Sequence, residues 1–273
     1  MASRTIDSRE QPLLSSTIVP TAEEDAPLLH RATSTQDEAS ANSGLMGGVS
    51  VTQFRVVFIM ICFTFGIACV DMTIMASLHP LITSHFHSAN TASWLSTAFM
   101  LTSTACQPMM GRLSDTTGRK KPYLFGLLLF SVATAWCALA SSMLSFILAR
   151  AVCGIGAGIT LTMGGIMISD VVPIEIRGIY QAYINIVYGV GSVMGAATGG
   201  LIAEAVGWRW TFGIQVPILL SCLVVSMMAI PSDLGKSVSL QVESTLESLR
   251  TFDWIGSLLL TLLLTCLILG LVC

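Results

Sequence analysis

The stretch GRLSDTTGRKK, residues 111–121, is a short polar segment between two long apolar runs. It contains the cations Arg112, Arg119, Lys120 and Lys121, in a chain of which only 11% is charged. Cytoplasmic connections between membrane helices are enriched in Lys and Arg. The stretch therefore predicts a cytoplasmic connection between two membrane-spanning helices, and the orientation of the neighbouring segments follows from it.

The composition is that of a membrane protein. Hydrophobic residues make up 53% of the 273 residues, and the mean hydropathy is +0.77. Soluble proteins carry roughly 25% charged residues, so the membrane class is strongly favoured. Most of the acidic excess lies in residues 1–50, which hold three Arg and seven acidic residues. The remainder has no basic patch, which argues against a nucleic-acid partner.

Six apolar segments follow, each near the roughly 20 residues that cross a ~30 Å hydrocarbon core. They lie at about 54–78, 92–110, 122–142, 144–168, 180–203 and 211–230, of which the second is rich in Ser and Thr and the fifth in Gly. A seventh starts at Trp254 and is still apolar at Cys273. The pattern predicts an all-α membrane protein with a six-helix bundle and the start of a seventh helix.

The cations place the N-terminus in the cytoplasm, because the connections on that side also carry Arg55, Arg177, Lys236 and Arg250, and the opposite side carries only Arg209. Four parts result. Residues 1–50 are predicted to be a disordered cytoplasmic tail without a signal peptide. Residues 51–231 form the bundle, 232–252 a cytoplasmic loop and 253–273 the truncated seventh helix.

A cytoplasmic anchor does not require Gly111, Asp115 or Gly118, although a solvated loop with an incidental Asp is one interpretation of them. The order Gly, Asp four residues on, then Gly-Arg-Lys resembles the loop signature of the major facilitator superfamily. Three further stretches resemble motifs of that family, in the same order: VDMTIMASLHPLI (70–82), LARAVCGIGAGI (148–159) and GSVMGAATGGLI (191–202).

The resemblance covers about residues 54–273. GWRWTFGIQVPI (207–218) is similar to the fourteen-span group of drug:proton antiporters. Two other stretches, 94–115 and 168–186, resemble fungal vacuolar basic amino acid transporters more narrowly. Two departures stand out: Ala196 occupies a position where the family usually has Pro, and the chain resembles only the N-terminal half of a transporter.

The resemblance implies a proton or substrate site at Asp71 and Arg150. An Arg inside a membrane helix costs roughly 2.5–3.5 kcal/mol unless it faces a cavity or a partner. Asp71 lies late in the first predicted helix and Arg150 early in the fourth. We expect both side chains to face one aqueous cavity, where Asp71 carries a proton or binds a cationic group and Arg150 binds a carboxylate. The alternatives are a capping role for Asp71 and snorkelling of Arg150 to the interface.

The family pattern also implies a cytoplasmic latch that stabilises one state of the transport cycle. Its residues are Gly111, Asp115, Gly118, Arg119 and Asp170, and Arg177 is expected beside them. Surface ion pairs contribute only about 0–1 kcal/mol, which suits a gate that must open.

Glycines recur every four residues in the fifth apolar segment, at Gly191, Gly195 and Gly199, and Gly200 completes the motif. Spacing of this kind lets two membrane helices approach closely. Packing alone is one interpretation, and a seam that slides between transport states is the functional one.

The eight cysteines lie within apolar runs, and no grouping of Cys or His suggests a metal site. No nucleophile motif or phosphate loop is recognisable, because the glycines at 154–158 have membrane-apolar flanks. We therefore expect no cofactor, no metal and no enzymatic activity.

The tail contains EEDAPLLH, residues 23–30, in which Glu24, Leu28 and Leu29 fit an acidic dileucine sorting signal read by an adaptor. Together with the vacuolar-like resemblance it favours the vacuolar membrane, with the plasma membrane as the alternative.

The leading hypothesis is a proton-coupled antiporter that moves basic amino acids into the vacuole or exports drug-like molecules, represented by its N-terminal half. Its partners would be a small-molecule substrate, protons and the lipid bilayer, with the other half, or a second copy in a homodimer, completing the cavity. A truncated non-transporting or regulatory membrane protein, an incomplete gene product and a seven-helix receptor are the alternatives.

Overall fold

A computed structural model describes residues 51–87 and 92–230, together with isolated helical residues between 256 and 270. The helices are α2 Val51–His85, α3 Ala92–Thr117, α4 Lys120–Leu139, α5 Met143–Val171, α6 Ile174–Ala205, α7 Trp208–Gly213 and α8 Gln215–Ala229. The described part of the chain contains no strand. The expected all-α fold is confirmed. The predicted tail with its sorting residues Glu24, Leu28 and Leu29, the loop at 232–252 and most of the seventh helix lie outside the described residues.

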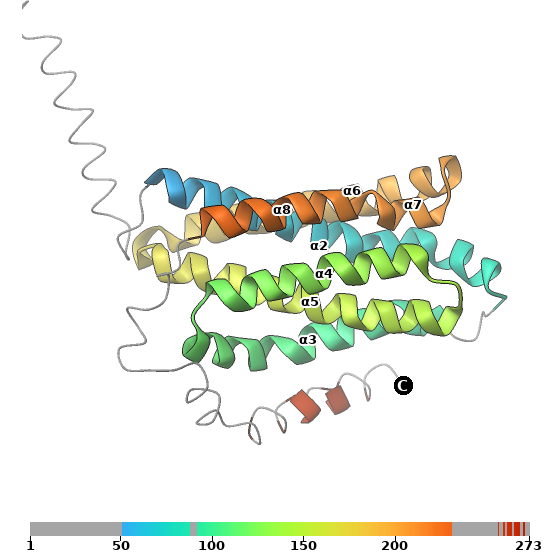
Figure 1. Cartoon of the computed structure of the whole chain (residues 1–273), viewed down its shortest axis with the longest axis horizontal. Helices are drawn as coiled ribbons and strands as arrows, with labels where there is room; N and C mark the ends of the chain where they lie inside the picture. The colour runs from blue at the N-terminus through green and yellow to red at the C-terminus, as the bar shows by residue number, and fades with distance from the viewer. Residues whose placement is uncertain are drawn as a thin grey trace, which may run out of the picture. The chain divides into compact units, whose positions relative to one another are not determined.

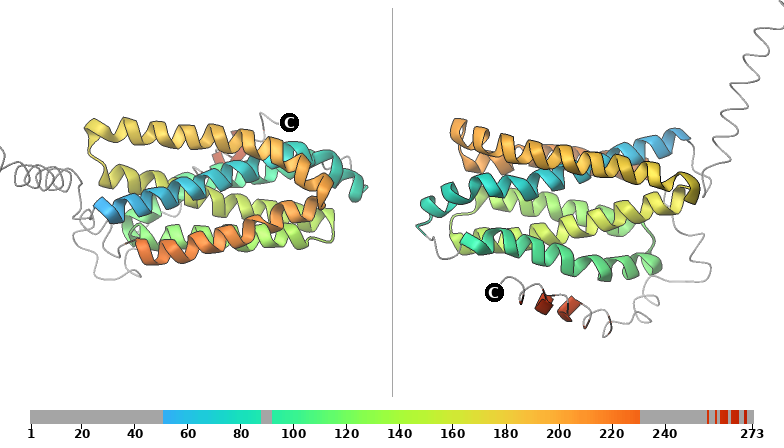
Figure 2. Two further views of the ribbon diagram at one scale, coloured as in Figure 1. Left: turned by 90° about the horizontal axis from the view of Figure 1, so that it is seen from above. Right: turned by 180° about the vertical axis from the view of Figure 1, so that it is seen from behind.

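The helices run alongside one another (Figures 1 and 2). α2 packs against α6 and the α7–α8 pair, α5 packs against α3 and α4, and the α7–α8 pair also packs against α4. α7 and α8 together form one span, Trp208–Ala229. The two join at Ile214, near Pro217, which has no N–H to donate to the carbonyl of Gly213. The six predicted spans thus correspond to α2, α3, α4, α5, α6 and α7–α8.

The connection between α3 and α4 is much shorter than predicted. Residues 111–117 continue α3, and only Gly118 and Arg119 separate the two helices. Gly118 has a φ of 83°, which reverses the chain in the left-handed region that favours glycine. Gly111 lies inside α3, and a Cβ added there would meet no atom within 4 Å. The prediction of a polar loop over 111–121 was therefore wrong for residues 111–117, which belong to α3, and for Lys120 and Lys121, which begin α4. Of its two glycines, only Gly118 has a backbone reason to be glycine.

We expect Gly118→Ala to lower the free energy of unfolding by about 1–2 kcal/mol, because Ala is strained at positive φ. Gly111→Ala is the matched control. It should be neutral or raise stability by up to about 1 kcal/mol, since Ala favours a helix more than Gly does. Thermal unfolding of the detergent-purified chain, followed by tryptophan fluorescence, measures both. Equal midpoints for the two variants would contradict the turn geometry.

Five of the spans are long and apolar enough to cross a membrane by length and composition, and α3 is the exception. Four of its hydroxyl groups, those of Thr102, Ser103, Ser114 and Thr117, donate to carbonyl groups. Thr102 donates to Ala98 O on its own helix at 2.8 Å and is also 2.8 Å from Ala151 O of α5. A Ser- and Thr-rich helix can therefore lie among the others with few unpaired polar groups.

Two apolar clusters fill the interior. One, towards the ends of the helices at the α3–α4 turn, includes Ala68 and Cys153. The other, towards the opposite ends, includes Ile74, Ala149 and Trp208. Residues 69–73 of α2 and Arg150 of α5 are at the boundary between the clusters, which places the candidate site in the middle of the bundle.

Candidate functional site

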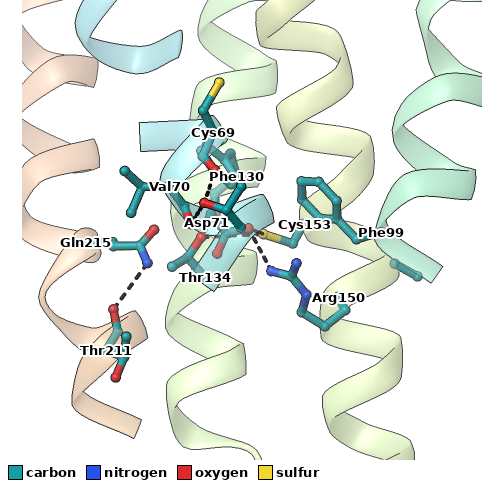
Figure 3. Close-up of polar contacts among 12 residues, drawn as sticks. Cys69, Val70, Asp71, Phe99, Phe130, Thr134, Arg150, Cys153, Thr211 and Gln215 are labelled. Atoms are coloured by element: carbon teal, nitrogen blue, oxygen red, sulfur yellow. Dashed lines mark hydrogen bonds and ion pairs between the residues drawn. The ribbon is translucent and has the colours of Figure 1, made fainter. Parts of the chain in front are cut away.

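A buried ion pair joins α2 to α5. Arg150 Nη1 donates to Asp71 Oδ2 at 2.6 Å, and the two side chains are only 1% and 0% exposed (Figure 3). Sequence reasoning placed Asp71 and Arg150 in one site, and the structure brings them into direct contact. The structure overturns one part of that expectation, because the pair is enclosed by side chains and does not line an open cavity in this conformation. Neither the capping role of Asp71 nor the snorkelling of Arg150 is observed.

Aromatic rings and small polar groups surround the pair. The guanidinium carbon of Arg150 lies 4.4 Å from the ring centre of Phe99 on α3 and 5.9 Å from that of Phe212 on α7. Contacts of this kind stabilise a desolvated cation. The Cys153 thiol is 3.8 Å from Asp71 Oδ2. Helices α3 and α7, in addition to the two that carry the charges, therefore border the site.

The pair retains unused hydrogen-bonding capacity. Asp71 Oδ1 and Arg150 Nε have no hydrogen-bond partner among the described residues. A buried charge that loses its counter-charge is strongly destabilised, whereas a buried pair contributes little net stability. The arrangement can therefore exchange partners: a proton on Asp71, or a carboxylate brought to Arg150, would replace the existing contact.

Two polar side chains near the site were missed by sequence reasoning. Thr211 on α7 and Gln215 on α8 are buried, and their Oγ1 and Oε1 atoms have no partner among the described residues. Gln215 Nε2 donates to Thr211 O at 3.1 Å. In Figure 3 Gln215 is seen on the opposite side of Asp71 from Arg150. The sequence did contain a signal for Gln215, because a polar amide within an apolar membrane span is unusual and indicates a functional position.

A second charge cluster lies at the α3–α4 turn. Arg119 Nη1 is 2.6 Å from Asp115 Oδ1, and its Nε is 2.8 Å from Asp170 Oδ2 at the end of α5. The Arg119 side chain is 7% exposed, compared with 62% for Asp115 and 28% for Asp170. Arg119 also donates to Ser114 Oγ, a contact that sequence reasoning missed. The expected grouping of Asp115, Arg119 and Asp170 is observed.

Arg177 does not join these carboxylates. Its Nη2 donates to Ser169 O at 2.6 Å and lies 3.4 Å from Val172 O, so it caps the carbonyl end of α5. A cation at a helix C-terminus is favourable there, because it interacts with the unpaired carbonyl groups.

The glycine motif of α6 packs on α2, except for one member. A Cβ on Gly195 would come within 2.7 Å of Val70 O, and one on Gly199 within 2.7 Å of Ile74 Cγ1. A Cβ on Gly191 would be 3.0 Å from Gly66 O. Gly200 has no atom within 4 Å of its Cβ position and lies outside this seam.

The fold is shared with solved transporters. The human organic anion transporter MFSD10 matches with a TM-score of 0.60 at 16% identity, over 76% of this chain and 53% of that chain. A peptide transporter in complex with sulfate matches with a TM-score of 0.60 at 13% identity, over 85% of this chain and 50% of its own. Because the sequence identities are this low, the two matches establish similarity of fold only.

Sequence comparison gives the family. Vacuolar basic amino acid transporter 1 of Saccharomyces cerevisiae is 38% identical over 70% of this chain and 34% of its own length. Multidrug resistance protein fnx1 of Schizosaccharomyces pombe is 40% identical over 74% of this chain and 37% of its own. The chain thus spans about a third of the length of these relatives. Residues 56–272 match the Major Facilitator Superfamily, and the chain belongs to that family.

Proposed function

We propose that this chain forms part of a proton-coupled antiporter that carries basic amino acids into the vacuole. The ion pair between Asp71 and Arg150 is the observation that carries the proposal, because it places one carboxylate and one guanidinium in the middle of a membrane bundle. Similarity to Vacuolar basic amino acid transporter 1 supports the substrate class. Family membership makes transport, rather than enzymatic catalysis, the activity to be tested.

The pair suits a free amino acid as well as a proton. Protonation of Asp71 neutralises its carboxylate and removes the attraction that holds Arg150. Deprotonated Asp71 can instead attract the ammonium group of a basic substrate, and Arg150 then has donors available for the α-carboxylate of that substrate, in a bidentate geometry that guanidinium favours. Proton and cationic substrate therefore compete for one carboxylate, which is the physical requirement for exchange in opposite directions.

The cytoplasmic cluster would act as the latch of the cycle. Arg119 ties the α3–α4 turn to the end of α5 through Asp170, while Asp115 is mostly exposed. Partly exposed pairs contribute about 0–1 kcal/mol, so they bias a conformation without locking it. The remainder of a longer chain, or a second copy of this one, would supply the facing wall of the substrate cavity.

A drug-like molecule is the second candidate substrate. Multidrug resistance protein fnx1 is a relative at 40% identity, and the rings of Phe99 and Phe212 border the ion pair. Aromatic walls around a charge suit lipophilic ions.

We place the protein in the vacuolar membrane, with the plasma membrane as the alternative. Two vacuolar transporters of Saccharomyces cerevisiae and one vacuolar membrane transporter of Schizosaccharomyces pombe are among its relatives. An adaptor would read the tail signal at Glu24, Leu28 and Leu29.

Uptake of lysine, arginine and histidine by vacuolar vesicles with an imposed proton gradient tests the proposal. We expect Asp71→Asn to abolish proton-dependent uptake, because the amide cannot release a proton. Glu204→Gln is the matched control, since Glu204 is an exposed carboxylate of α6 away from the pair, and it should leave uptake unchanged. The assay compares this chain with any longer product of the same gene. Undiminished uptake by Asp71→Asn would remove Asp71 from the mechanism, and uptake of drugs alone would favour the second substrate.

A further inference from the structure

A long apolar cavity opens on the side of the bundle formed by α2, α6 and the α7–α8 pair. Its volume is about 790 Å³, within the roughly 300–1,000 Å³ range of small-molecule sites. Along α2 its wall extends from Phe58 to Ile74, seventeen residues that span about 24 Å of helix. The cavity therefore runs through most of a ~30 Å hydrocarbon core. It is distinct from the enclosed Asp71–Arg150 pair, since neither of those residues is part of its wall.

The residues that line the cavity favour a ligand without charge. None of the described residues that line the cavity is charged, so a phosphate or carboxylate head would find no cation there. The wall is made almost entirely of aliphatic and aromatic side chains. Gly66 of α2 and Gly191 of α6 contribute no side chain to the wall, and they lie where the two helices come close, since a Cβ on Gly191 would be only 3.0 Å from Gly66 O. A flat, rigid apolar body fits such a surface with little loss of conformational entropy.

Two buried polar side chains lie in the wall on α7 and α8, and the other hydroxyl-bearing side chains of the wall are Tyr183 and Thr198 of α6. Thr211 and Gln215 belong to the wall, and both are more than nine-tenths buried. Their Oγ1 and Oε1 atoms have no partner among the described residues. A hydroxyl group matches this pair, because it can donate a hydrogen bond to Gln215 Oε1 and accept one from Thr211. Neighbouring side chains cover both atoms in this conformation, so a ligand reaches them through a rotation of the Thr211 or Gln215 side chain.

The depth of these groups agrees with a membrane lipid. Trp208 begins α7 at the non-cytoplasmic end of the bundle, and Trp is enriched at membrane interfaces. Thr211 and Gln215 follow it by three and seven residues, or about 5 and 10 Å of helix. A ligand hydroxyl held there lies near the interface, with its apolar body directed along the cavity towards Phe58 and Tyr183.

From this combination we propose that the cavity binds a membrane sterol, with its hydroxyl at Thr211 and Gln215 and its ring system against Gly66 and Gly191. The site is separate from the transport site, and it makes sterol a lipid ligand of the α2–α6–α8 face.

Photolabelling tests the site. The full 273-residue chain is placed in phosphatidylcholine nanodiscs with a diazirine-bearing cholesterol analogue that keeps its free hydroxyl, and labelled peptides are mapped by mass spectrometry. Label is expected on α2 and α6 where they line the cavity. Val190→Trp should reduce it on the order of tenfold, because Val190 is 54% exposed and lines the cavity. Val193→Trp is the matched control: Val193 is 70% exposed on the same helix outside the cavity wall, and its variant should label normally.

The proposed hydrogen bonds to the sterol hydroxyl are tested by comparing two probes. The same probe with its hydroxyl methylated should label about three- to tenfold less, and Gln215→Leu should remove that preference. Thr211→Val replaces Gln215→Leu if the latter does not elute as a monodisperse protein. Equal labelling by a diazirine phosphatidylcholine, equal loss in Val190→Trp and Val193→Trp, or label confined to other helices would overturn the proposal.

Discussion

Asp71→Ala is expected to lower the free energy of unfolding by about 3–5 kcal/mol, because it leaves the Arg150 guanidinium buried without its counter-charge. Arg150→Met should have an effect of similar size, since it leaves the Asp71 carboxylate unpaired. The double variant Asp71→Ala/Arg150→Met is expected to recover most of the loss, because no unpaired charge then remains in the buried site. Thermal unfolding in detergent measures all three variants.

The same variants separate stability from transport. The double variant should fold and yet show no proton-dependent uptake in vesicles, because neither a proton carrier nor a carboxylate-binding group remains. Additive losses in the double variant would show that the two side chains do not interact energetically. Single variants as stable as the original chain would mean that the pair is hydrated in the working protein and not enclosed.

Gly195→Val is expected to disrupt the contact between α2 and α6. The added side chain would collide with the backbone of α2, where Val70 O is 2.7 Å and Val70 Cα 2.9 Å from the Cβ position. Backbone cannot move aside as a flexible side chain does, so we expect a loss at or above the roughly 1–3 kcal/mol usual for overpacking. Unfolding midpoints, and the yield of monodisperse protein, measure the change.

Gly200→Val is the matched control for that substitution. Gly200 is five residues further along α6 and belongs to the same sequence motif, but a Cβ there meets no atom within 4 Å. It should therefore have little effect on stability. A similar loss in both variants would contradict a specific role of the α2–α6 seam, because helix propensity favours Val over Gly at both positions.

The sequence allowed the class of fold and the location of the site to be predicted. Long apolar segments report membrane helices directly, and a charged residue within such a segment needs a partner or a cavity. Asp71 and Arg150 were the charges that best met this condition, and they are paired in the structure. The grouping of Arg119 with Asp115 and Asp170 followed from the motif in the same way.

Other features depend on packing and could not be predicted. The polar residues at 111–117 suggested a loop. They instead extend α3, because a helix can continue beyond the hydrocarbon core without losing its backbone hydrogen bonds. Gly195 and Gly200 belong to one sequence motif and cannot be distinguished there. In the structure a Cβ added at Gly195 would point at α2, whereas one added at Gly200 would meet no atom within 4 Å. Enclosure of the ion pair depends on Phe99 and Phe212, which come from helices far away in the sequence.

The two-residue turn at Gly118 and Arg119 has a consequence for biosynthesis. α3 is the least suited of the six spans to enter lipid alone, and the turn joins it directly to α4, which is strongly apolar. Carbonyl groups of α5 become available to α3 hydroxyls only after α5 has been made. We therefore expect α3 and α4 to leave the translocon as one helical hairpin, with α4 supplying the partition free energy for both.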